Sequence, residues 1–400
     1  MNEKTKNLTK IILSIFLIGT IASCSHNNKQ MKLNLTSLPV TGLSGNLAKG
    51  VSATYAALID DKLIVAGGAN FPRKLGFEGG SKAFYNEIML FDKTRSEWKL
   101  IGHLPDSSAY GVSVPVIGGA LWIGGNTASK SLAKCYKVSL TENDSVKLDD
   151  FPALPAPMDN FAGCVSGDLV FVGGGIENGK PSNSLYCINI KTDTAWSKLP
   201  DFPGTPRVQP ILAAIEKDSK KYVYLLGGFF GGNAENKPAM ATDVLRYDVA
   251  EQKWEKAGEQ IDVTTQKPFS LGGATAMPLD NRYILCFGGV NHDIFLDAIT
   301  TQYNIGNDTT TSAEEKARLN LEFSKNYMTQ PIEYYKFNTE CRIFDTFTGN
   351  WKTINVTPHT ARAGATLVFN GKEFFAVQGE LKPGVRSAVT IKGEIIFKNQ

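Results

Sequence analysis

The chain has 400 residues, 42% of them hydrophobic, which is enough to bury a sizeable core. Its 42 basic and 39 acidic residues give a net charge of +3, and no Lys/Arg run with interleaved aromatic residues occurs, so we expect no nucleic-acid partner. The 38 glycines, many of them paired, and the short apolar runs between turn residues predict an all-β fold.

The N-terminus has the features of a targeting signal. Lysines precede an apolar run over residues 11–21 that is too short to span a membrane as a helix. Small residues then lead into Cys24, a pattern that resembles the bacterial lipobox, in which cleavage precedes a cysteine that becomes lipidated. We therefore predict a signal peptide over residues 1–23, a lipidated tether over residues 24–31 and a periplasmic protein that meets the membrane only through its lipid. The alternative is a plain signal peptide with an incidental cysteine. The sequence indicates neither which membrane holds the lipid nor the oligomeric state.

Residues 32–400 contain an internal repeat built on glycine pairs. Each pair ends a hydrophobic strand, and most pairs are followed by an aromatic residue, a turn and a tryptophan near a Leu-Pro step. This pattern resembles the kelch motif, whose units each form a four-stranded blade. Six such units predict a six-bladed kelch β-propeller. The pairs are Gly67-Gly68, Gly124-Gly125, Gly173-Gly174, Gly227-Gly228 and Gly288-Gly289, and the single Gly379 marks the sixth unit.

The last unit, over residues 361–398, contains only three strand-like runs. Lys32–Pro39 alternates apolar and polar residues and finishes in the Leu-Pro step that ends other units. We predict that this N-terminal strand supplies the missing outer strand of the C-terminal blade. Pairing the two segments would close the ring and cover two exposed sheet edges.

The fifth unit carries an insertion over about residues 292–338, because the segment between Gly289 and Trp351 is much longer than its equivalents in the other units. Ser312–Glu315 is a capping-box sequence, and apolar residues follow it at helical spacing, which predicts a short helix over Ala313–Lys325. Loops of this kind emerge on one face of a propeller, so we expect the insertion to overhang the mouth of the central channel.

The cysteines after Cys24 are odd in number, so they cannot all pair within the chain. Most lie in apolar strand-like runs, and we expect buried free thiols; only Cys286 and Cys341 fall on strands that could be neighbours. Because no CxxC motif or His/Cys cluster occurs, we expect no metal site.

Polar residues gather on the loops expected at the channel mouth, where a rigid scaffold commonly presents binding and catalytic groups. Glu380 follows a buried strand, and Arg386 returns across a Pro-Gly turn, so the two side chains can meet over one ligand. The alternative is an ion pair on a solvated hairpin. Arg207 and Arg362 begin inner strands, where a packing role is the alternative to substrate binding. The remaining candidates for substrate binding are Asn70, Arg73, Tyr110 and Asn291.

Four segments resemble the N-acetylneuraminate epimerase family, the sialic acid mutarotases, and especially its cyclically permuted kelch-repeat branch. They are residues 66–71, 109–115, 288–295 and 379–386, the last of which reads Gly-Glu-Leu-Lys-Pro-Gly-Val-Arg. The resemblance extends over all six units. The Glu/Arg loop lies in mid-chain in non-permuted members and in the last unit here, and closure around a ring keeps neighbouring blades together despite that change.

The resemblance implies interconversion of the α and β anomers of N-acetylneuraminate by acid/base-assisted ring opening. Glu380 would be the acid/base, with Arg386 beside it. A guanidinium fork suits the carboxylate of this sugar acid, and Arg386, Arg207, Arg362 or Arg73 could supply it. Neither a metal nor an organic cofactor is implied.

Three other functions compete with this interpretation. A sialidase would show Asp-box repeats, and the sequence has none. A copper radical oxidase needs histidine and tyrosine ligands, and the chain has only 4 histidines, one of them in the predicted tether. The alternative that stays open is a non-catalytic kelch propeller that binds a glycan or a protein partner on its loop face.

Overall fold

The computed structural model describes residues 30–371 and 373–398. Antiparallel strands dominate this part of the chain, which confirms the all-β prediction, and its helical elements are two α-helices and four 3₁₀ turns. The predicted signal peptide, and Cys24 with most of the predicted tether, lie outside the described residues.

Six four-stranded antiparallel sheets make up the body of the described chain. In the first five sheets the strands pair antiparallel in chain order, and the connections between the second and third strands are longer than a tight turn. The first three sheets are β2 (Tyr55–Ile59), β3 (Lys62–Ala66), β6 (Glu87–Asp92) and β7 (Glu97–His103); β8 (Val112–Val116), β9 (Gly119–Ile123), β10 (Cys135–Leu140) and β11 (Val146–Phe151); and β13 (Ala162–Ser166), β14 (Leu169–Gly173), β17 (Leu185–Asn189) and β18 (Ser197–Leu199).

The other three sheets follow the same plan, except that the last takes a strand from the start of the chain. They are β19 (Ile211–Lys217), β20 (Lys220–Leu226), β23 (Asp243–Asp248) and β24 (Lys253–Glu259); β25 (Ala274–Leu279), β26 (Tyr283–Gly288), β27 (Glu340–Asp345) and β28 (Asn350–Val356); and β29 (Thr366–Asn370), β30 (Glu373–Val377), β33 (Ile391–Lys398) and β1 (Gln30–Ser37).

Small hairpins extend the connections between the second and third strands of several sheets. They are β4 (Ala69–Asn70) with β5 (Ala83–Phe84), β15 (Ile176–Glu177) with β16 (Lys180–Pro181) and the added strand β12 (Met158–Asp159), β21 (Phe229–Phe230) with β22 (Ala239–Met240), and β31 (Glu380–Lys382) with β32 (Val385–Arg386). The 3₁₀ turns are η1 (Leu47–Lys49), η2 (Gly76–Glu78), η3 (Ile332–Tyr335) and η4 (Pro358–Thr360).

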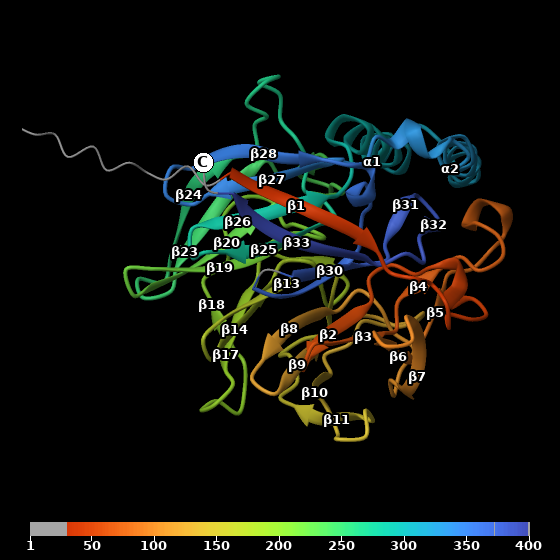
Figure 1. Ribbon diagram of the computed structural model, residues 1–400. Coiled ribbons are helices and arrows are strands. Elements are labelled where there is room, and N and C mark those ends of the chain that lie inside the picture. The colour runs from red at the N-terminus through yellow and green to blue at the C-terminus, as the bar shows by residue number, and fades with distance from the viewer. Residues whose placement is uncertain (1–29, 372, 399–400) are drawn as a thin grey trace, which may run out of the picture.

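The first and last strands of the described chain pair with each other. β1 runs antiparallel to β33 along its whole length, from Gln30 opposite Lys398 to Ser37 opposite Ile391. Figure 1 shows the red β1 lying beside the blue β33. Met31 and Leu33 of β1 are buried against the apolar residues of the last two sheets. The alternation of apolar and polar residues in β1 therefore corresponds to one buried and one exposed face.

The core consists of apolar clusters between adjacent sheets. Among the described residues, each pair of consecutive sheets shares one buried cluster, and one further cluster joins the last sheet to the first. In that closing cluster, Phe375 and Val377 of β30 pack with Leu63 and Val65 of β3. Burying an aliphatic or aromatic side chain contributes about 1.5–3 kcal/mol, so each of these contacts between sheets stabilises the arrangement substantially.

Tryptophans link sheets through hydrogen bonds as well as packing. In three places the indole Nε1 donates to the carbonyl of a proline in the preceding sheet's final segment, at 2.9–3.0 Å. The donor and acceptor pairs are Trp98 with Pro39, Trp196 with Pro152 and Trp254 with Pro200. Leu38-Pro39 follows β1, so the N-terminal segment serves the first sheet in the way that Phe151-Pro152 and Leu199-Pro200 serve theirs.

Backbone hydrogen bonds form a closed ring among residues that lie just before the first strand of each of the six sheets. Each bond joins equivalent residues of neighbouring sheets, and the six bonds measure 2.8–3.2 Å. The residues all have φ between 51° and 67°, a left-handed conformation that non-glycine residues adopt only where their surroundings impose it. The ring consists of Ala53, Tyr110, Asn160, Gln209, Gly273 and Gly364, with Ala53 N–H donating to the carbonyl of Gly364 to complete the circle.

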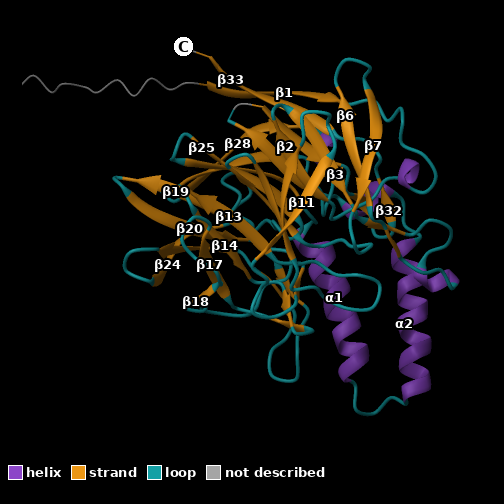
Figure 2. Ribbon diagram, turned by 90° about the horizontal axis from the view of Figure 1, so that it is seen from below, coloured by secondary structure: helices purple, strands orange, loops and turns teal. Residues whose placement is uncertain are grey.

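The insertion of the fifth sheet folds into two helices, α1 (His292–Asn307) and α2 (Ala313–Met328). Figure 2 shows the two helices side by side, extending away from the strands. The capping-box sequence gives α2 its start, because the Ser312 side chain accepts a hydrogen bond from the Glu315 N–H at 3.2 Å. The sequence pattern predicted one helix in this insertion, and the structure contains a second, α1. No helix in the described part of the chain is long and apolar enough to cross a membrane.

Candidate active site

A cavity of about 420 Å³ lies between the hydrogen-bonded ring and the two inserted helices. Its size falls within the range of small-molecule binding sites. Tyr110, Asn160, Gln209 and Gly364 of the ring line its floor, and α1 and α2 contribute residues that include Phe295 and Tyr327. The charged residues in its lining are Lys82, Glu380 and Arg386.

The fold places Glu380 through a backbone pairing next to the ring. Glu380 and Ala363 exchange both backbone hydrogen bonds, at 2.7 and 2.9 Å, and Ala363 precedes the ring residue Gly364. Ser52, which precedes Ala53 in the ring, pairs with Ala69 in the same way at 3.0 Å. Because Gly364 and Ala53 have little or no side chain, the space above this side of the ring stays open for the side chain of Glu380.

The carboxylate of Glu380 is held through one of its two oxygens. Oε1 lies 2.6 Å from Nη1 of Arg386 and accepts a hydrogen bond from the Gly384 N–H at 2.8 Å. Among the described residues, Oε2 has no hydrogen-bond partner. The Pro-Gly turn between β31 and β32 therefore brings both the arginine and a backbone donor to the same oxygen, and leaves the other oxygen available to a ligand.

Arg386 is fixed from several sides. Its side chain is only 4% exposed and that of Glu380 is 26% exposed, so the arginine is buried and the carboxylate is partly buried. Arg386 Nε donates to the hydroxyl of Ser52 at 3.1 Å, and its guanidinium carbon lies 5.8 Å from the ring centroid of Phe71. The contact of Nη1 with Glu380 is an ion pair without hydrogen-bond geometry, and the attraction between the two charges keeps the carboxylate beside the guanidinium.

The floor of the cavity carries amides and a phenol. Gln209 Nε2 donates to Asn160 Oδ1 at 2.9 Å, and Asn160 Nδ2 donates to the buried Asp159 at 2.6 Å. The Tyr110 hydroxyl accepts from Lys82 Nζ at 2.9 Å. The site therefore places one carboxylate opposite a wall of hydrogen-bonding groups, an arrangement suited to a polyhydroxylated ligand.

The family model described as N-acetylneuraminate epimerase matches residues 151–400, which is more than half of the chain. The chain belongs to the N-acetylneuraminate epimerase family. N-acetylneuraminate epimerase of Haemophilus influenzae (strain PittEE) is 31% identical over 268 residues, covering 66% of this chain and 65% of that protein. N-acetylneuraminate epimerase 1 of Escherichia coli O6:H1 is 28% identical over 246 residues, covering 61% of this chain and 59% of that protein.

A solved structure described as "Structure of YjhT" aligns at 26% identity with a TM-score of 0.48, covering 59% of this chain and 62% of that one. The chain thus spans less than two thirds of the length of the N-acetylneuraminate epimerases that it matches. The segment matched by the epimerase model contains Glu380, Arg386 and both inserted helices, whereas Lys82 and Tyr110 lie before it.

Of the site residues predicted from the sequence, the structure brings Glu380, Arg386 and Tyr110 together at the cavity. Two predicted polar residues instead support the backbone. Asn70 is 2% exposed, donates to the carbonyls of Asn46 and Gly50, and accepts from Tyr85. Asn291 caps α1 by accepting from the N–H groups of Asp293 and Ile294. Neither residue is part of the cavity lining.

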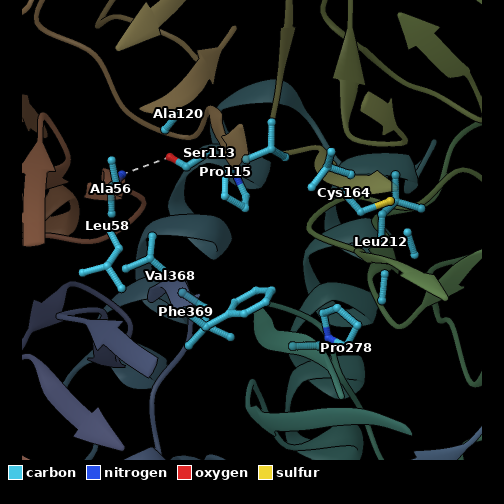
Figure 3. Close-up of a pocket in the computed structure, with 18 residues that line it drawn as sticks. Ala56, Leu58, Ser113, Pro115, Ala120, Cys164, Leu212, Pro278, Val368 and Phe369 are labelled. Atoms are coloured by element: carbon cyan, nitrogen blue, oxygen red, sulfur yellow. Dashed lines mark hydrogen bonds between the residues drawn. The ribbon is translucent and has the colours of Figure 1, made fainter. Parts of the chain in front are cut away.

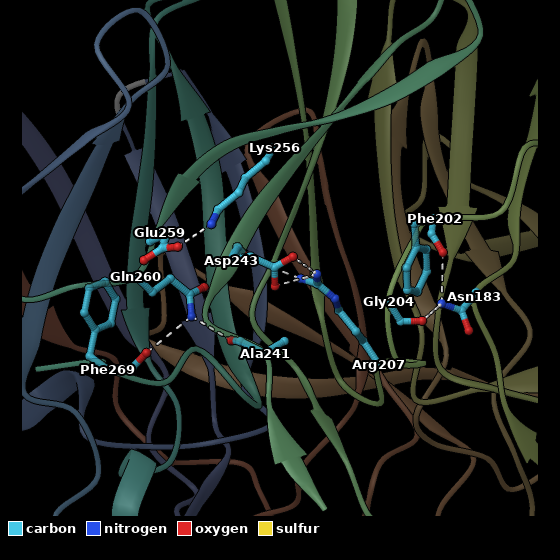
Figure 4. Close-up of polar contacts among 10 residues, drawn as sticks. All are labelled: Asn183, Phe202, Gly204, Arg207, Ala241, Asp243, Lys256, Glu259, Gln260 and Phe269. Carbon is cyan, nitrogen blue, oxygen red and sulfur yellow. Dashed lines mark hydrogen bonds and ion pairs between the residues drawn. The ribbon is translucent and has the colours of Figure 1, made fainter. Parts of the chain in front are cut away.

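The three other predicted arginines also lie outside the cavity lining. Arg207 pairs with Asp243 through Nη2 at 2.7 and 2.8 Å, as Figure 4 shows. Arg362 donates from Nη1 to the carbonyls of Gln378 and Val389 at 2.8 and 2.7 Å, and burial lowers its pKa to about 10. Arg73 is exposed. The arginines that begin inner strands therefore hold loops and strands in place.

Several cavity residues were not predicted from the sequence, namely Lys82, Asn160, Gln209 and Tyr327. Asn160 and Gln209 occupy the same position in their repeats as Tyr110, two residues before a first strand, so aligning the repeats at that position would have found them. Tyr327 comes from α2, and burial raises its pKa, so the phenol stays protonated and can donate a hydrogen bond. The sequence carries no local signal for Lys82.

A second cavity, of about 100 Å³, lies among the first strands (Figure 3). Its lining is apolar, with Leu58, Pro115, Leu212 and Phe369 among its residues, and burial raises the pKa of its one thiol, Cys164. The five cysteines in the described residues are free, and no group of three or more potential metal ligands occurs in that part of the chain. This cavity lacks the groups that proton transfer requires, so the larger, charged cavity is the candidate site.

Proposed function

We propose that this chain is a mutarotase that interconverts the α and β anomers of N-acetylneuraminate. Its membership of the N-acetylneuraminate epimerase family supports this activity and does not favour a non-catalytic binding propeller. The observation that carries the proposal is the arrangement of Glu380, whose Oε1 is fixed by Arg386 and the Gly384 N–H while Oε2 faces no protein donor among the described residues.

Ring opening of the sugar requires two proton movements. Glu380 Oε2 takes the proton of the anomeric hydroxyl, and the bond between the anomeric carbon and the ring oxygen breaks as the carbonyl forms. The ring oxygen then receives the proton from the Glu380 carboxyl group, which becomes a carboxylate again. Rotation about the bond to the carbonyl carbon and reclosure on the other face reverse these steps. One positioned carboxyl group serves both directions, directly or through a water molecule, because the protons taken and returned are equal in number.

Arg386 contributes by holding Glu380 rather than by contacting the reacting atoms. It is buried, and it contacts Oε1 of Glu380 and the Ser52 hydroxyl. This contact orients the carboxylate, so Oε2 need not reorganise during the reaction. The amide groups of Asn160 and Gln209 line the same cavity and can bind the hydroxyl and N-acetyl groups of the sugar.

We also propose that residues 32–400 form one six-bladed kelch propeller that carries an insertion at about residues 292–338. The closed ring of backbone hydrogen bonds, the six clusters between sheets and the pairing of β1 with β33 support this organisation. The signal peptide, the lipid on Cys24 and the periplasmic location are proposals that rest on the sequence pattern of residues 1–24.

Anomer exchange measured by one-dimensional NMR tests the proposed activity. The α form of N-acetylneuraminate is followed just after its enzymatic release, with and without the protein. We expect the wild-type protein to accelerate exchange and Glu380→Gln to reduce kcat by about 10²- to 10⁴-fold while the fold stays intact. Glu142→Gln, an exposed residue of the turn between β10 and β11, is the matched control and keeps wild-type activity.

The two parts of the proposal can fail separately. A wild-type protein that leaves the exchange rate unchanged contradicts the mutarotase function. A fully active Glu380→Gln protein leaves the function standing and removes Glu380 from the role of acid/base.

A further inference from the structure

Lys82 is a cation without an acidic partner at the edge of the cavity. It is the last residue of the connection between β4 and β5, and its ammonium donates to the Tyr110 hydroxyl at 2.9 Å. The same ammonium lies 4.9 Å from the centroid of the Tyr110 ring and 5.8 Å from that of Phe71. No carboxylate of the described residues lies within ion-pair distance of it. Aromatic faces therefore hold this charge in place and leave donors of the ammonium unused.

Arg386, by contrast, is buried and already forms an ion pair with Glu380, although its Nη1 makes no hydrogen bond. Its Nη1 lies 2.6 Å from Glu380, its Nε donates to Ser52, and its side chain is 4% exposed. A substrate carboxylate that bound Arg386 would compete with Glu380 for the same guanidinium. The charges of Glu380 and Arg386 cancel each other, so the cavity lining carries one net positive charge, which comes from Lys82.

We propose that Lys82, together with the Tyr110 hydroxyl, binds the carboxylate of the substrate. This inference rests on the proposed function for the identity of the substrate as a sugar acid. Lys82 supplies a charge-assisted donor, and Tyr110, which accepts from Lys82 through its oxygen, keeps its own proton to donate to the same carboxylate. The ring of Phe71 lies against both Lys82 and Arg386, 5.8 Å from each cationic group, so it ties the binding charge to the wall that holds Glu380.

This assignment makes Lys82 a residue that selects monoanionic sugars over neutral ones. The ammonium contacts a group that does not change during ring opening, so it stabilises the ground state and the transition state equally. Removing it is therefore expected to raise KM and leave kcat nearly unchanged.

A thermodynamic cycle tests the contact directly, because it compares the loss of Lys82 from the protein with the loss of the carboxylate charge from the ligand. Calorimetry measures the binding of N-acetylneuraminate and of its methyl ester, which lacks the charge, to wild-type protein and to Lys82→Met. Lys74→Met, an exposed cation of the same connection outside the cavity lining, is the matched control. Lys82→Arg tests rescue by a second cation. Circular dichroism verifies that each variant is folded.

We expect wild-type protein to bind the acid about 10- to 100-fold more tightly than the ester, as for a charge-assisted hydrogen bond. Lys82→Met should bind the acid and the ester within about threefold of each other. Its KM for the acid should rise by about 10- to 100-fold, and its kcat should stay within about threefold of wild type. Lys74→Met should behave as wild type, and Lys82→Arg should restore most of the preference for the acid.

Other results overturn the assignment. If Lys82→Met still prefers the acid as strongly as wild type does, or if wild-type protein binds neither compound, Lys82 does not bind the carboxylate. Loss of the preference on Arg386→Met but not on Lys82→Met transfers the role to Arg386. Calorimetry detects binding whether or not the protein accelerates anomer exchange. A wild-type protein that binds the acid through Lys82 but fails to accelerate exchange therefore refutes the mutarotase function alone.

Discussion

The Nζ of Lys382 donates a hydrogen bond to the carbonyl of Met328, the last residue of α2, at 3.1 Å. The same ammonium donates to the Gln330 carbonyl at 2.6 Å. Lys382 lies between Glu380 and the Pro-Gly turn, so this contact fastens the loop that carries the proposed acid/base to the C-terminal end of the inserted helix, whose carbonyls favour a positive charge. The insertion therefore positions the loop as well as covering the cavity.

Replacement of Lys382 by Met is expected to loosen the loop without removing any group that touches the substrate. We expect kcat to fall by about 3- to 30-fold, since small misplacements of a catalytic group reduce rate strongly. Amide hydrogen exchange over residues 380–386 should become faster, and Lys382→Arg should restore part of the rate. Lys325→Met, an exposed lysine of α2, is the control. Unchanged exchange protection in the loop would contradict the positioning role.

Leu33 of β1 tests the contribution of the N-terminal strand to stability. Its side chain is 4% exposed and belongs to the same cluster as Phe374 and Ile391. Leu33→Ala should lower the free energy of unfolding by about 2–4 kcal/mol, because it leaves a cavity between the last two sheets. Asn34→Ala, on the exposed face of the same strand, should change it by less than about 0.5 kcal/mol. Urea denaturation measures both values, and equal effects would mean that β1 contributes no packing.

The repeat, the all-β class and the start of α2 were predictable because each depends on local chemistry. Glycine pairs end buried strands where a left-handed backbone is needed, and Gly67 and Gly68 have φ of 63° and 97°. The Ser312 cap is likewise a property of a few consecutive residues. The pairing of β1 with β33 was predicted because the last unit has one strand fewer than the other units, a comparison that a repeated sequence makes possible.

The roles of single polar side chains were less predictable, because they depend on contacts between distant segments. Asn291 has the sequence position of a loop ligand, and only the presence of α1 makes it a helix cap. Asn70 points to backbone carbonyls of the η1 segment rather than to the cavity. Lys82 is held at the cavity by the rings of Phe71 and Tyr110. Phe71 belongs to a loop of the first sheet, whereas Tyr110 lies just before the second sheet. No single stretch of sequence contains that relationship.

Arg207 provides a test of the supporting role that the structure gives to the inner-strand arginines. Arg207 is 2% exposed, and burial lowers its pKa while Asp243 opposes that effect. Arg207→Met leaves Asp243 unpaired, and we expect the free energy of unfolding to fall by about 1–3 kcal/mol, less than for a fully buried pair because Asp243 is 37% exposed. The KM for N-acetylneuraminate should stay within about twofold of wild type. A large rise in KM with unchanged stability would indicate substrate binding instead.

Glu177 gives a prediction for the pH dependence of stability. Burial acts to raise its pKa, but hydrogen bonds from Ser184, Tyr186 and Ser182 outweigh burial, and the pKa of Glu177 is lowered. A carboxyl group whose pKa is lower in the folded state than in the unfolded state stabilises the protein at pH values above its unfolded-state pKa of about 4.3. This stabilisation is lost as the pH falls through the folded-state pKa.

Glu177→Gln should therefore be less stable than wild type at pH 7, and the difference in unfolding free energy should shrink as the pH is lowered from about 5 to 3. Denaturant titrations at several pH values measure it, with Glu142→Gln as an exposed control that shows no such trend. The amide of Gln cannot accept the three hydroxyl hydrogen bonds as a carboxylate does. The loss of unfolding free energy therefore appears at the pH values at which Glu177 of the wild-type protein is ionised. A difference that stays constant over this pH range would mean that Glu177 contributes through packing rather than through its charge.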